Sequence, residues 1–365
     1  MTFPTTVTVN AREAAGSPQP DVAAGVPRVL ARCRDLVRPS LSAAIERLHP
    51  WPGEMAAFSL GWCEVGGAPA DGSFEGKGLR QTLAVLCAEA VGAPGESAVP
   101  GAVAVELVHT FSLLHDDIMD GDGTRRQRET VWKAYGTGPA VLAGDALFAL
   151  AVQTLAETPG PHTAAAVARL SRTLSGLVRG QAEDLLFAAR PWTGPDAVRT
   201  DEYRSMAELK TGTLLGCAAA LGGLLGGAPA RTVAALDRAG RHLGVAFQAV
   251  DDLLGIWGDP AVTGKPVYSD LRQRKKTYPV LAALAGAGPR SRELAALLNS
   301  PLALDDAGAV RAAALVEACG GRAATLEEAR RHLDAARACL RSVPLVPRAA
   351  REIEALLGFL LHRRV

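Results

Sequence analysis

Three aspartates end an apolar run in LLHDDIMDGDGTRR, residues 113–126. In a helix, Asp116 and Asp120 lie one turn apart and face the same way, whereas Asp117 is rotated by roughly 100°. The glycines that follow end the helix, so the carboxylates emerge where the backbone dipole is also negative. A hard divalent cation would compensate these charges. Mg²⁺ suits the task because it prefers carboxylate oxygens and leaves room for phosphate.

A second acidic cluster occurs in FQAVDDLLGIWGD, residues 247–259. Asp251 and Asp252 again follow an apolar run, and Asp259 comes slightly later. Two such clusters at the ends of two apolar helices can face each other across a bundle. Together they would hold several Mg²⁺ ions.

Cationic side chains accompany both clusters. They are Lys77, Arg80, Arg125, Arg126, Lys210, Lys265, Lys275 and Lys276, with Thr211 next to Lys210. Many cations close to acidic clusters indicate a polyanion that is bridged by metal ions. A diphosphate fits this description, because it binds Mg²⁺ and the forks of Arg and Lys together.

Two other interpretations of the first cluster are possible. Aspartates before a glycine can simply mark a helix end. A calcium-binding EF-hand loop over residues 118–129 is the second alternative, because Asp120, Asp122 and Glu129 fall at ligand positions. However, Ile118 occupies the first position, where a carboxylate is required, and three arginines in the segment would repel the ion.

Composition limits the function classes. The chain has 365 residues, of which 48% are hydrophobic and 21% charged, enough for a large buried core. The net charge of +1 argues against a nucleic-acid-binding protein. No two of the six cysteines form a CxxC pair, so we expect reduced thiols and a cytoplasmic location.

Helix-forming residues dominate, and no alternating strand pattern of useful length occurs. We expect a flexible tail over residues 1–25, which is a candidate for binding an unidentified partner, and one all-α domain over 26–365. The segment 50–75 is expected to be an irregular connection. The predicted helices are 27–48, 79–91, 101–120, 138–156, 162–188, 200–226, 230–256, 276–286, 291–299, 307–319, 324–342 and 347–362.

One uncharged stretch, between Lys210 and Arg231, is long enough to cross a bilayer. It is also rich in glycine. We therefore expect a buried helix whose small residues allow close helix packing, ending near Gly226, and no membrane span.

Together these motifs resemble those of the trans-prenyltransferases, the isoprenyl diphosphate synthases or polyprenyl synthetases, and among them the geranylgeranyl diphosphate synthases. The resemblance runs from about residue 75 to 285. The two acidic clusters resemble the family's two aspartate-rich motifs, the first followed by two arginines. GKGLR resembles the GKxxR segment, and His109 in VELVHTF matches the histidine of the same site. RGQAEDL matches the GQ motif at Gly180 and Gln181, and LKTG matches the KT motif.

The resemblance implies an all-α isoprenoid-synthase helical bundle with a central active-site cavity, a homodimer, three Mg²⁺ ions per site and isoprenyl diphosphates as substrates. The implied metal-binding residues are Asp116, Asp120 and Asp251, with Asp117 and Asp252 in support. The implied allylic diphosphate site is Arg125, Lys210, Thr211, Gln248, Lys265 and Lys275. The implied isopentenyl diphosphate site is Lys77, Arg80, His109 and Arg126. Catalysis is assigned to Asp116, Asp117, Asp120, Arg125, Lys210, Asp251 and Lys265.

Three positions depart from the family pattern. Gly255 stands where the second motif often has its last aspartate, so one metal contact is missing or shifted. Gln81 replaces a usual proline and Gly78 a common arginine, which leaves Lys77 and Arg80 in place.

The implied reaction is ionisation of an allylic diphosphate and head-to-tail attack by isopentenyl diphosphate. Product length is expected to depend on Phe111 and Ser112, which precede Asp116 by about one turn. One aromatic side chain with a small neighbour suggests a tunnel floor at intermediate depth, although Phe111 is also explained by ordinary core packing. We expect the twenty-carbon geranylgeranyl diphosphate, with fifteen-carbon farnesyl diphosphate next.

Two competing functions remain. A class I terpene cyclase on the same fold would not need a second diphosphate site, and Lys77, Arg80, His109 and Arg126 argue against it. A non-catalytic partner subunit should have lost an acidic cluster, whereas here only the position of Gly255 departs.

Overall fold

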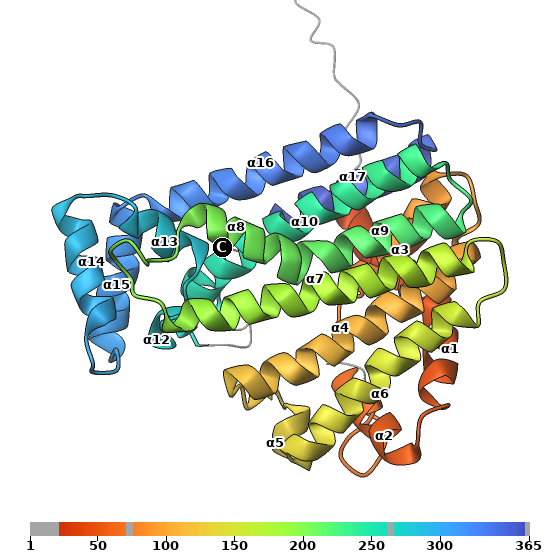
Figure 1. The fold of residues 1–365 in the computed structure, drawn as a ribbon, viewed down its shortest axis with the longest axis horizontal. Helices are drawn as coiled ribbons and strands as arrows, with labels where there is room; N and C mark the ends of the chain where they lie inside the picture. Colours follow the sequence, from red (N-terminus) through yellow and green to blue (C-terminus); the bar gives the residue numbers. More distant parts are fainter. Residues whose placement is uncertain (1–21, 71–75, 261–265, 362–365) are drawn as a thin grey trace, which may run out of the picture.

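The computed structural model describes residues 22–70, 76–260 and 266–361 (Figure 1). These residues are mostly helical, and their only strands are the short β1 and β2, which confirms the all-α prediction. Val22 already begins the first helix, so the greater part of the predicted tail lies outside the described residues, as does Lys265.

The helices and strands of the described residues follow one another along the chain. They are α1 (Val22–Ile45), α2 (Pro50–Ser59), α3 (Leu79–Ala90), η1 (Gly95–Ala98), α4 (Val99–Asp120), β1 (Thr124–Arg125), β2 (Arg128–Glu129), α5 (Val131–Tyr135), α6 (Thr137–Ala156), α7 (Thr163–Ala189), α8 (Thr200–Ala207), η2 (Glu208–Gly212), α9 (Thr213–Leu225), α10 (Ala230–Trp257), α12 (Ser269–Arg272), α13 (Tyr278–Leu284), α14 (Pro289–Asn299), α15 (Asp306–Ala318), α16 (Gly321–Arg341) and α17 (Pro347–Leu361).

The long helices run side by side along the molecule (Figure 1). Helix α10 packs against both α9 and α16, α4 packs against α6, and α3 packs against α9. The largest apolar core lies among these helices, and a separate apolar cluster joins α14 and α15 at one end. The two helices that carry the acidic clusters, α4 and α10, therefore belong to the packed centre of the bundle.

Small residues allow α9 and the turn before it to approach α10 closely. An ideal Cβ atom on Gly244 would lie 2.3 Å from the Cα atom of Gly212, so no larger residue fits there. Nearly all of α9 is buried, and the helix is capped at Gly226. The prediction of a buried, closely packed helix in this uncharged stretch is confirmed.

Two other helical segments are long and apolar enough to cross a bilayer by length and composition alone, namely Gly95–Asp120 and α6. The first is a helix of the protein core and carries the first acidic cluster. Its apolar character is thus accounted for by the packing of the bundle.

Some local predictions were wrong. The segment 50–75 was expected to be irregular, but Pro50–Ser59 forms α2, which begins with a proline at its first turn and is capped by the His49 ring. The single helix expected over 200–226 is interrupted by the π-helical turn η2. The strands β1 and β2 were not expected, because two residues cannot display an alternating pattern.

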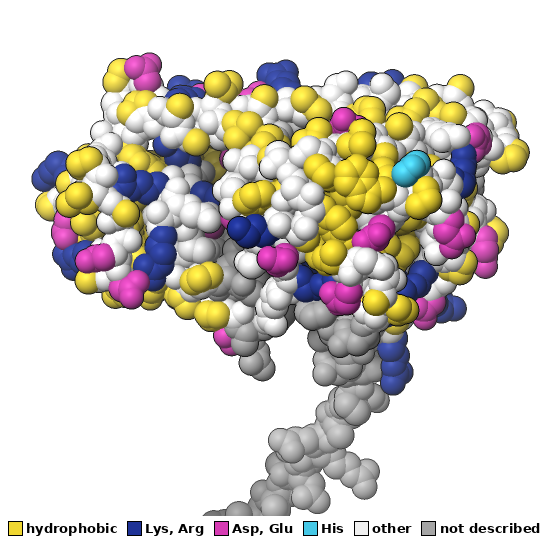
Figure 2. All heavy atoms as spheres, turned by 90° about the horizontal axis from the view of Figure 1, so that it is seen from below, with side chains coloured by type: hydrophobic (Ala, Val, Ile, Leu, Met, Phe, Trp, Pro, Cys, Tyr) yellow, Lys and Arg dark blue, Asp and Glu magenta, His cyan; other side chains and the backbone are white. Residues whose placement is uncertain are grey.

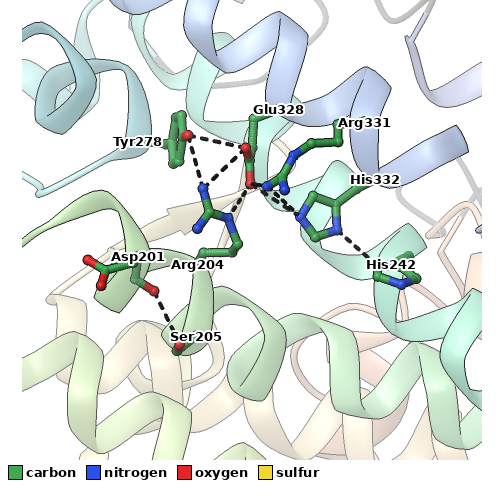
Figure 3. A network of polar contacts seen from close by, with 8 residues as sticks. All are labelled: Asp201, Arg204, Ser205, His242, Tyr278, Glu328, Arg331 and His332. Atoms are coloured by element: carbon green, nitrogen blue, oxygen red, sulfur yellow. Dashed lines mark hydrogen bonds and ion pairs between the residues drawn. The ribbon is translucent and has the colours of Figure 1, made fainter. Parts of the chain in front are cut away.

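The buried carboxylate of Glu328 ties several helices together (Figure 3). Glu328 on α16 accepts hydrogen bonds from Arg204 on α8, at 2.5 Å, and from the hydroxyl of Tyr278 on α13, at 3.2 Å. His332 lies 3.2 Å from the same carboxylate and 3.0 Å from His242 on α10. This network fixes α8, α13 and α16 against α10.

Replacement of Glu328 by Gln is expected to destabilise the fold in a pH-dependent manner. Burial alone would raise the pKa of Glu328, but hydrogen bonds from His332, Arg204 and Arg331 outweigh burial and hold this pKa well below its usual range. The carboxylate therefore stabilises the fold above its unfolded-state pKa of about 4.3, and this contribution is lost as the pH falls further. At pH 7 the variant should lose about 3 kcal/mol of unfolding free energy, measured by urea denaturation.

The difference between the two proteins should shrink as the pH falls below about 4. The control is Glu327→Gln, because Glu327 neighbours Glu328 on α16 but is largely exposed, and this change should cost almost nothing. Equal losses at pH 7 and at pH 3.5 would contradict the electrostatic explanation.

Candidate active site

The first acidic cluster stands at the end of α4, which Gly121 terminates in a left-handed conformation. Asp117 is buried and accepts two hydrogen bonds from the Arg125 guanidinium, at 2.9 and 2.6 Å. Asp116 is partly exposed, and burial raises its pKa to about 6, although Lys210 opposes the rise. Asp120 accepts a hydrogen bond from Lys275 at 2.7 Å. Each carboxylate thus lies near a cation from another part of the chain.

A short hairpin after α4 directs the two arginines. Thr124 pairs with Glu129 and Arg125 with Arg128, and the turn between them contains Arg126 and Gln127. Both turn residues have positive φ, 51° and 63°, a conformation that favours glycine or asparagine. This strained turn sends Arg125 back onto α4 while the Arg126 guanidinium packs against Gly76.

The second acidic cluster lies in the last turns of α10. Asp252 is buried and accepts hydrogen bonds from the Tyr203 hydroxyl at 2.6 Å, the Tyr278 backbone at 2.9 Å and the Gln248 amide at 3.0 Å. Burial raises the pKa of Asp252 to about 7, and these donors oppose the rise. Gln248 in turn accepts a hydrogen bond from Thr211 at 2.9 Å. Asp252 is therefore a fixed internal acceptor, whereas its neighbour Asp251 is partly exposed.

Lys210 projects from the π-helical turn η2 beside the first cluster. Its ammonium group donates to Asp184 on α7 at 2.6 Å. Burial would lower the pKa of Lys210, but Asp116 and Asp184 raise it, so the side chain stays charged. Asp184 was not singled out from the sequence. It lies three residues after Gln181, and this helical spacing was the signal that could have found it.

A second cationic group gathers where α3 meets the middle of α4. The Arg80 guanidinium lies 3.1 Å from the His109 ring. Burial lowers the pKa of His109, and the nearby Arg80 and Arg126 lower it further, so the ring is neutral. The ammonium group of Lys77 stands 5.9 Å from the Phe359 ring. The buried Glu106, one turn before His109, was also missed by sequence reasoning.

The two residues expected to limit product length are placed differently from each other. Phe111 lies on α4 and is buried against α6. The centre of its ring is 5.6 Å from that of Phe148 and 5.0 Å from that of His115, and both contacts are edge to face. Ser112 instead bonds the backbone of its own helix at His109. Of the pair, Phe111 is the one that bridges two helices of the bundle.

The donor set is suited to Mg²⁺ only when phosphate completes the coordination. Among the described residues, no group of three or more acidic, histidine or cysteine side chains is placed to hold a metal ion without further ligands. Mg²⁺ normally binds through one or two carboxylates together with water and substrate phosphates. Asp116, Asp120 and Asp251 offer such sparse oxygen ligands with cations nearby, so the residues fit a Mg²⁺–diphosphate complex.

Comparison with known proteins shows the family to which the chain belongs. The family model described as polyprenyl synthetase matches residues 68–313. A (2E,6E)-farnesyl diphosphate synthase of Mycobacterium tuberculosis is 44% identical over 95% of this chain and 97% of its own length. A geranylgeranyl diphosphate synthase of the same species is 47% identical over 80% of this chain and 82% of its own. The crystal structure of a polyprenyl synthetase from Streptomyces coelicolor is 47% identical, covers 92% of this chain and 99% of its own, and gives a TM-score of 0.85.

Replacement of Gly180 by Ala is expected to disturb the turn that carries Lys210. An ideal Cβ atom on Gly180 would lie 2.4 Å from the backbone nitrogen of Lys210, and a backbone cannot yield cheaply. Overpacking of this kind should cost about 2 kcal/mol of unfolding free energy, measured by urea denaturation. The control is Gly138→Ala on α6, where a Cβ atom meets nothing within 4 Å and stability should not fall. A Gly180→Ala protein as stable as the natural chain would disprove the tight contact.

Proposed function

The chain belongs to the polyprenyl synthetase family and is a prenyltransferase that extends prenyl diphosphates head to tail, and we propose that its product is the twenty-carbon geranylgeranyl diphosphate. Fifteen-carbon farnesyl diphosphate is the next candidate. The observation that carries the chain-elongation function is the presence of two separate cationic groups. One contains Lys210 and Lys275, which contact Asp184 and Asp120, and the other contains the partly buried Arg80–His109 pair.

Each cationic group is proposed to hold one diphosphate. Arg125, Lys210 and Lys275, with Thr211, Gln248 and Lys265, would hold the allylic substrate, whereas Lys77, Arg80, His109 and Arg126 would hold isopentenyl diphosphate. Asp116, Asp120 and Asp251 would hold Mg²⁺, for which we propose three ions per site. Asp117 and Asp252 support these ligands through their buried hydrogen bonds.

The proposed reaction needs no side-chain nucleophile. Bound Mg²⁺ supplies neutralising charge for the leaving diphosphate. Lys210 and Arg125 stabilise the same oxygens as the allylic C–O bond breaks and its electron pair leaves with diphosphate. The double bond of isopentenyl diphosphate then forms the new C–C bond, and the proton lost from the adduct passes to the departing diphosphate. The apolar helices exclude water from the allylic cation.

The second cationic group also separates this function from its rivals. A terpene cyclase that folds one diphosphate substrate on itself has no use for a second cationic group built around an arginine that contacts a neutral histidine. A non-catalytic subunit should have lost an acidic cluster, whereas here only the position of Gly255 departs.

A homodimer and a cytoplasmic location are further parts of the proposal. Helix α6 exposes Val141, Leu142 and Phe148, and the face shown in Figure 2 carries a broad patch of hydrophobic side chains. Exposed apolar patches of this kind commonly mark protein–protein contacts. All six cysteines are free, which suits a reducing compartment.

Purified protein with Mg²⁺, labelled isopentenyl diphosphate and an allylic diphosphate is expected to give a labelled twenty-carbon product, and chelation of the metal should abolish it.

Phe111→Ala should lengthen the product, because it removes the ring that packs against Phe148 below the metal site. The readout is product length by chromatography. Phe58→Ala, at an equally buried ring on α2, is the control and should leave the length unchanged. An unchanged product from Phe111→Ala would mean that Phe111 is ordinary core packing.

The dimer proposal predicts a mass of two chains by light scattering at micromolar concentration. Leu142→Asp should reduce the mass to that of one chain, because it places a charge in the apolar patch. The control is Leu302→Asp, at an exposed leucine before α15, which should remain dimeric. A Leu142→Asp protein that keeps the mass of two chains would exclude α6 from the interface.

A further inference from the structure

The second acidic cluster lacks a carboxylate that the first one has. On α4, Asp116 and Asp120 stand one turn apart on one face of the helix. On α10, the residue one turn after Asp251 is Gly255, which has no side chain to offer. The second cluster would therefore present a single partly exposed carboxylate where the first presents two.

The space beside Gly255 is occupied by another aspartate. An ideal Cβ atom on Gly255 would lie 1.9 Å from Oδ2 and 2.4 Å from Cγ of Asp270. The Asp270 carboxylate thus fills the volume in which a side chain at position 255 would begin. Asp270 belongs to α12, a different element from α10.

The backbone holds this arrangement in place. The Tyr268 amide donates to the Ile256 carbonyl at 3.1 Å, and the Ser269 hydroxyl donates to the Gly255 carbonyl at 3.2 Å. Two consecutive residues before Asp270 are therefore attached to the last turn of α10. The approach of the carboxylate to Gly255 is a consequence of how α12 is anchored.

The negative charge of Asp270 raises the pKa of groups on both sides of the site. Burial raises the pKa of Asp252, and Asp270 adds to the rise. Burial would lower the pKa of Lys275, but Asp120 and then Asp270 raise it, and Lys275 contacts Asp120 directly. The backbone amide of Lys275 donates to the Asp270 carbonyl at 2.8 Å, so the segment that carries Asp270 connects the last turn of α10 to the cation that contacts the first cluster.

We propose that Asp270 is the metal-binding carboxylate that the second cluster lacks at position 255, acting beside Asp251. The inference rests on the proposed Mg²⁺–diphosphate site. Two carboxylates on each side match the way Mg²⁺ is held by one or two protein oxygens together with phosphate. The glycine at 255 is then a requirement of the arrangement, because any side chain there would collide with Asp270.

The test measures binding of inorganic diphosphate by calorimetry in excess Mg²⁺, which needs no turnover. Asp270→Asn keeps the size of the side chain and should weaken binding by about 10–100-fold, the range found when groups that support a metal site are removed. Asp270→Gly should weaken it similarly. The double variant Gly255→Asp with Asp270→Gly, which returns a carboxylate to α10, should recover most of the affinity.

The control is Asp306→Asn, because Asp306 is an exposed carboxylate that pairs with Arg272 of the same α12 but lies outside the site. Natural affinity in Asp270→Asn would overturn the proposal. Thermal unfolding checks that the double variant is folded. A folded double variant that binds diphosphate as weakly as Asp270→Gly would show that a carboxylate at position 255 cannot replace the one at position 270. If the natural chain itself binds no diphosphate in the presence of Mg²⁺, the proposed function fails. That result does not depend on how the variants compare with the natural chain.

Discussion

Like-charge repulsion between carboxylates is the constraint on which the rest of this structure depends. One helix of the core, α4, ends at Asp120, and another, α10, carries Asp251 and Asp252 in its last turns, where the helix dipoles are also negative. The chain compensates by bringing Arg125 to Asp117, Lys275 to Asp120 and Lys210 to Asp184 from separate segments. These pairs mean that the first acidic cluster can be assembled before any metal or substrate arrives.

Such a charged centre needs a rigid frame. Asp252 is fixed by Tyr203 and Tyr278, and Tyr278 in turn bonds Glu328, so a continuous set of contacts runs from α10 through α13 to α16. On the other side, Gly244 lets α10 lie directly against the turn that carries Lys210. Helix packing and site geometry are therefore set by the same residues.

Much of this could be predicted from the sequence, because helical spacing alone places Asp116 with Asp120 and sets Asp117 apart. The hairpin was not predictable, since its turn uses Arg126 and Gln127 where glycine or asparagine is expected. Asp184 was missed for a different reason. Its spacing from Gln181 places it on the same helix face, but its contact with Lys210, which is distant along the chain, is not encoded by local pattern or composition. The same holds for Asp270 beside Gly255.

The π-helical turn Glu208–Gly212 has a consequence for how this site can change over evolutionary time. A π-turn holds more residues than an α-turn, so it behaves as a single-residue insertion absorbed within a continuous helix. Removing one residue would restore regular α-helix and rotate α8 against α9 by roughly 100°. Tyr203 would then no longer face Asp252. Length changes in this segment would therefore act as rotations of the active-site wall, whereas length changes in the loops would leave it unmoved.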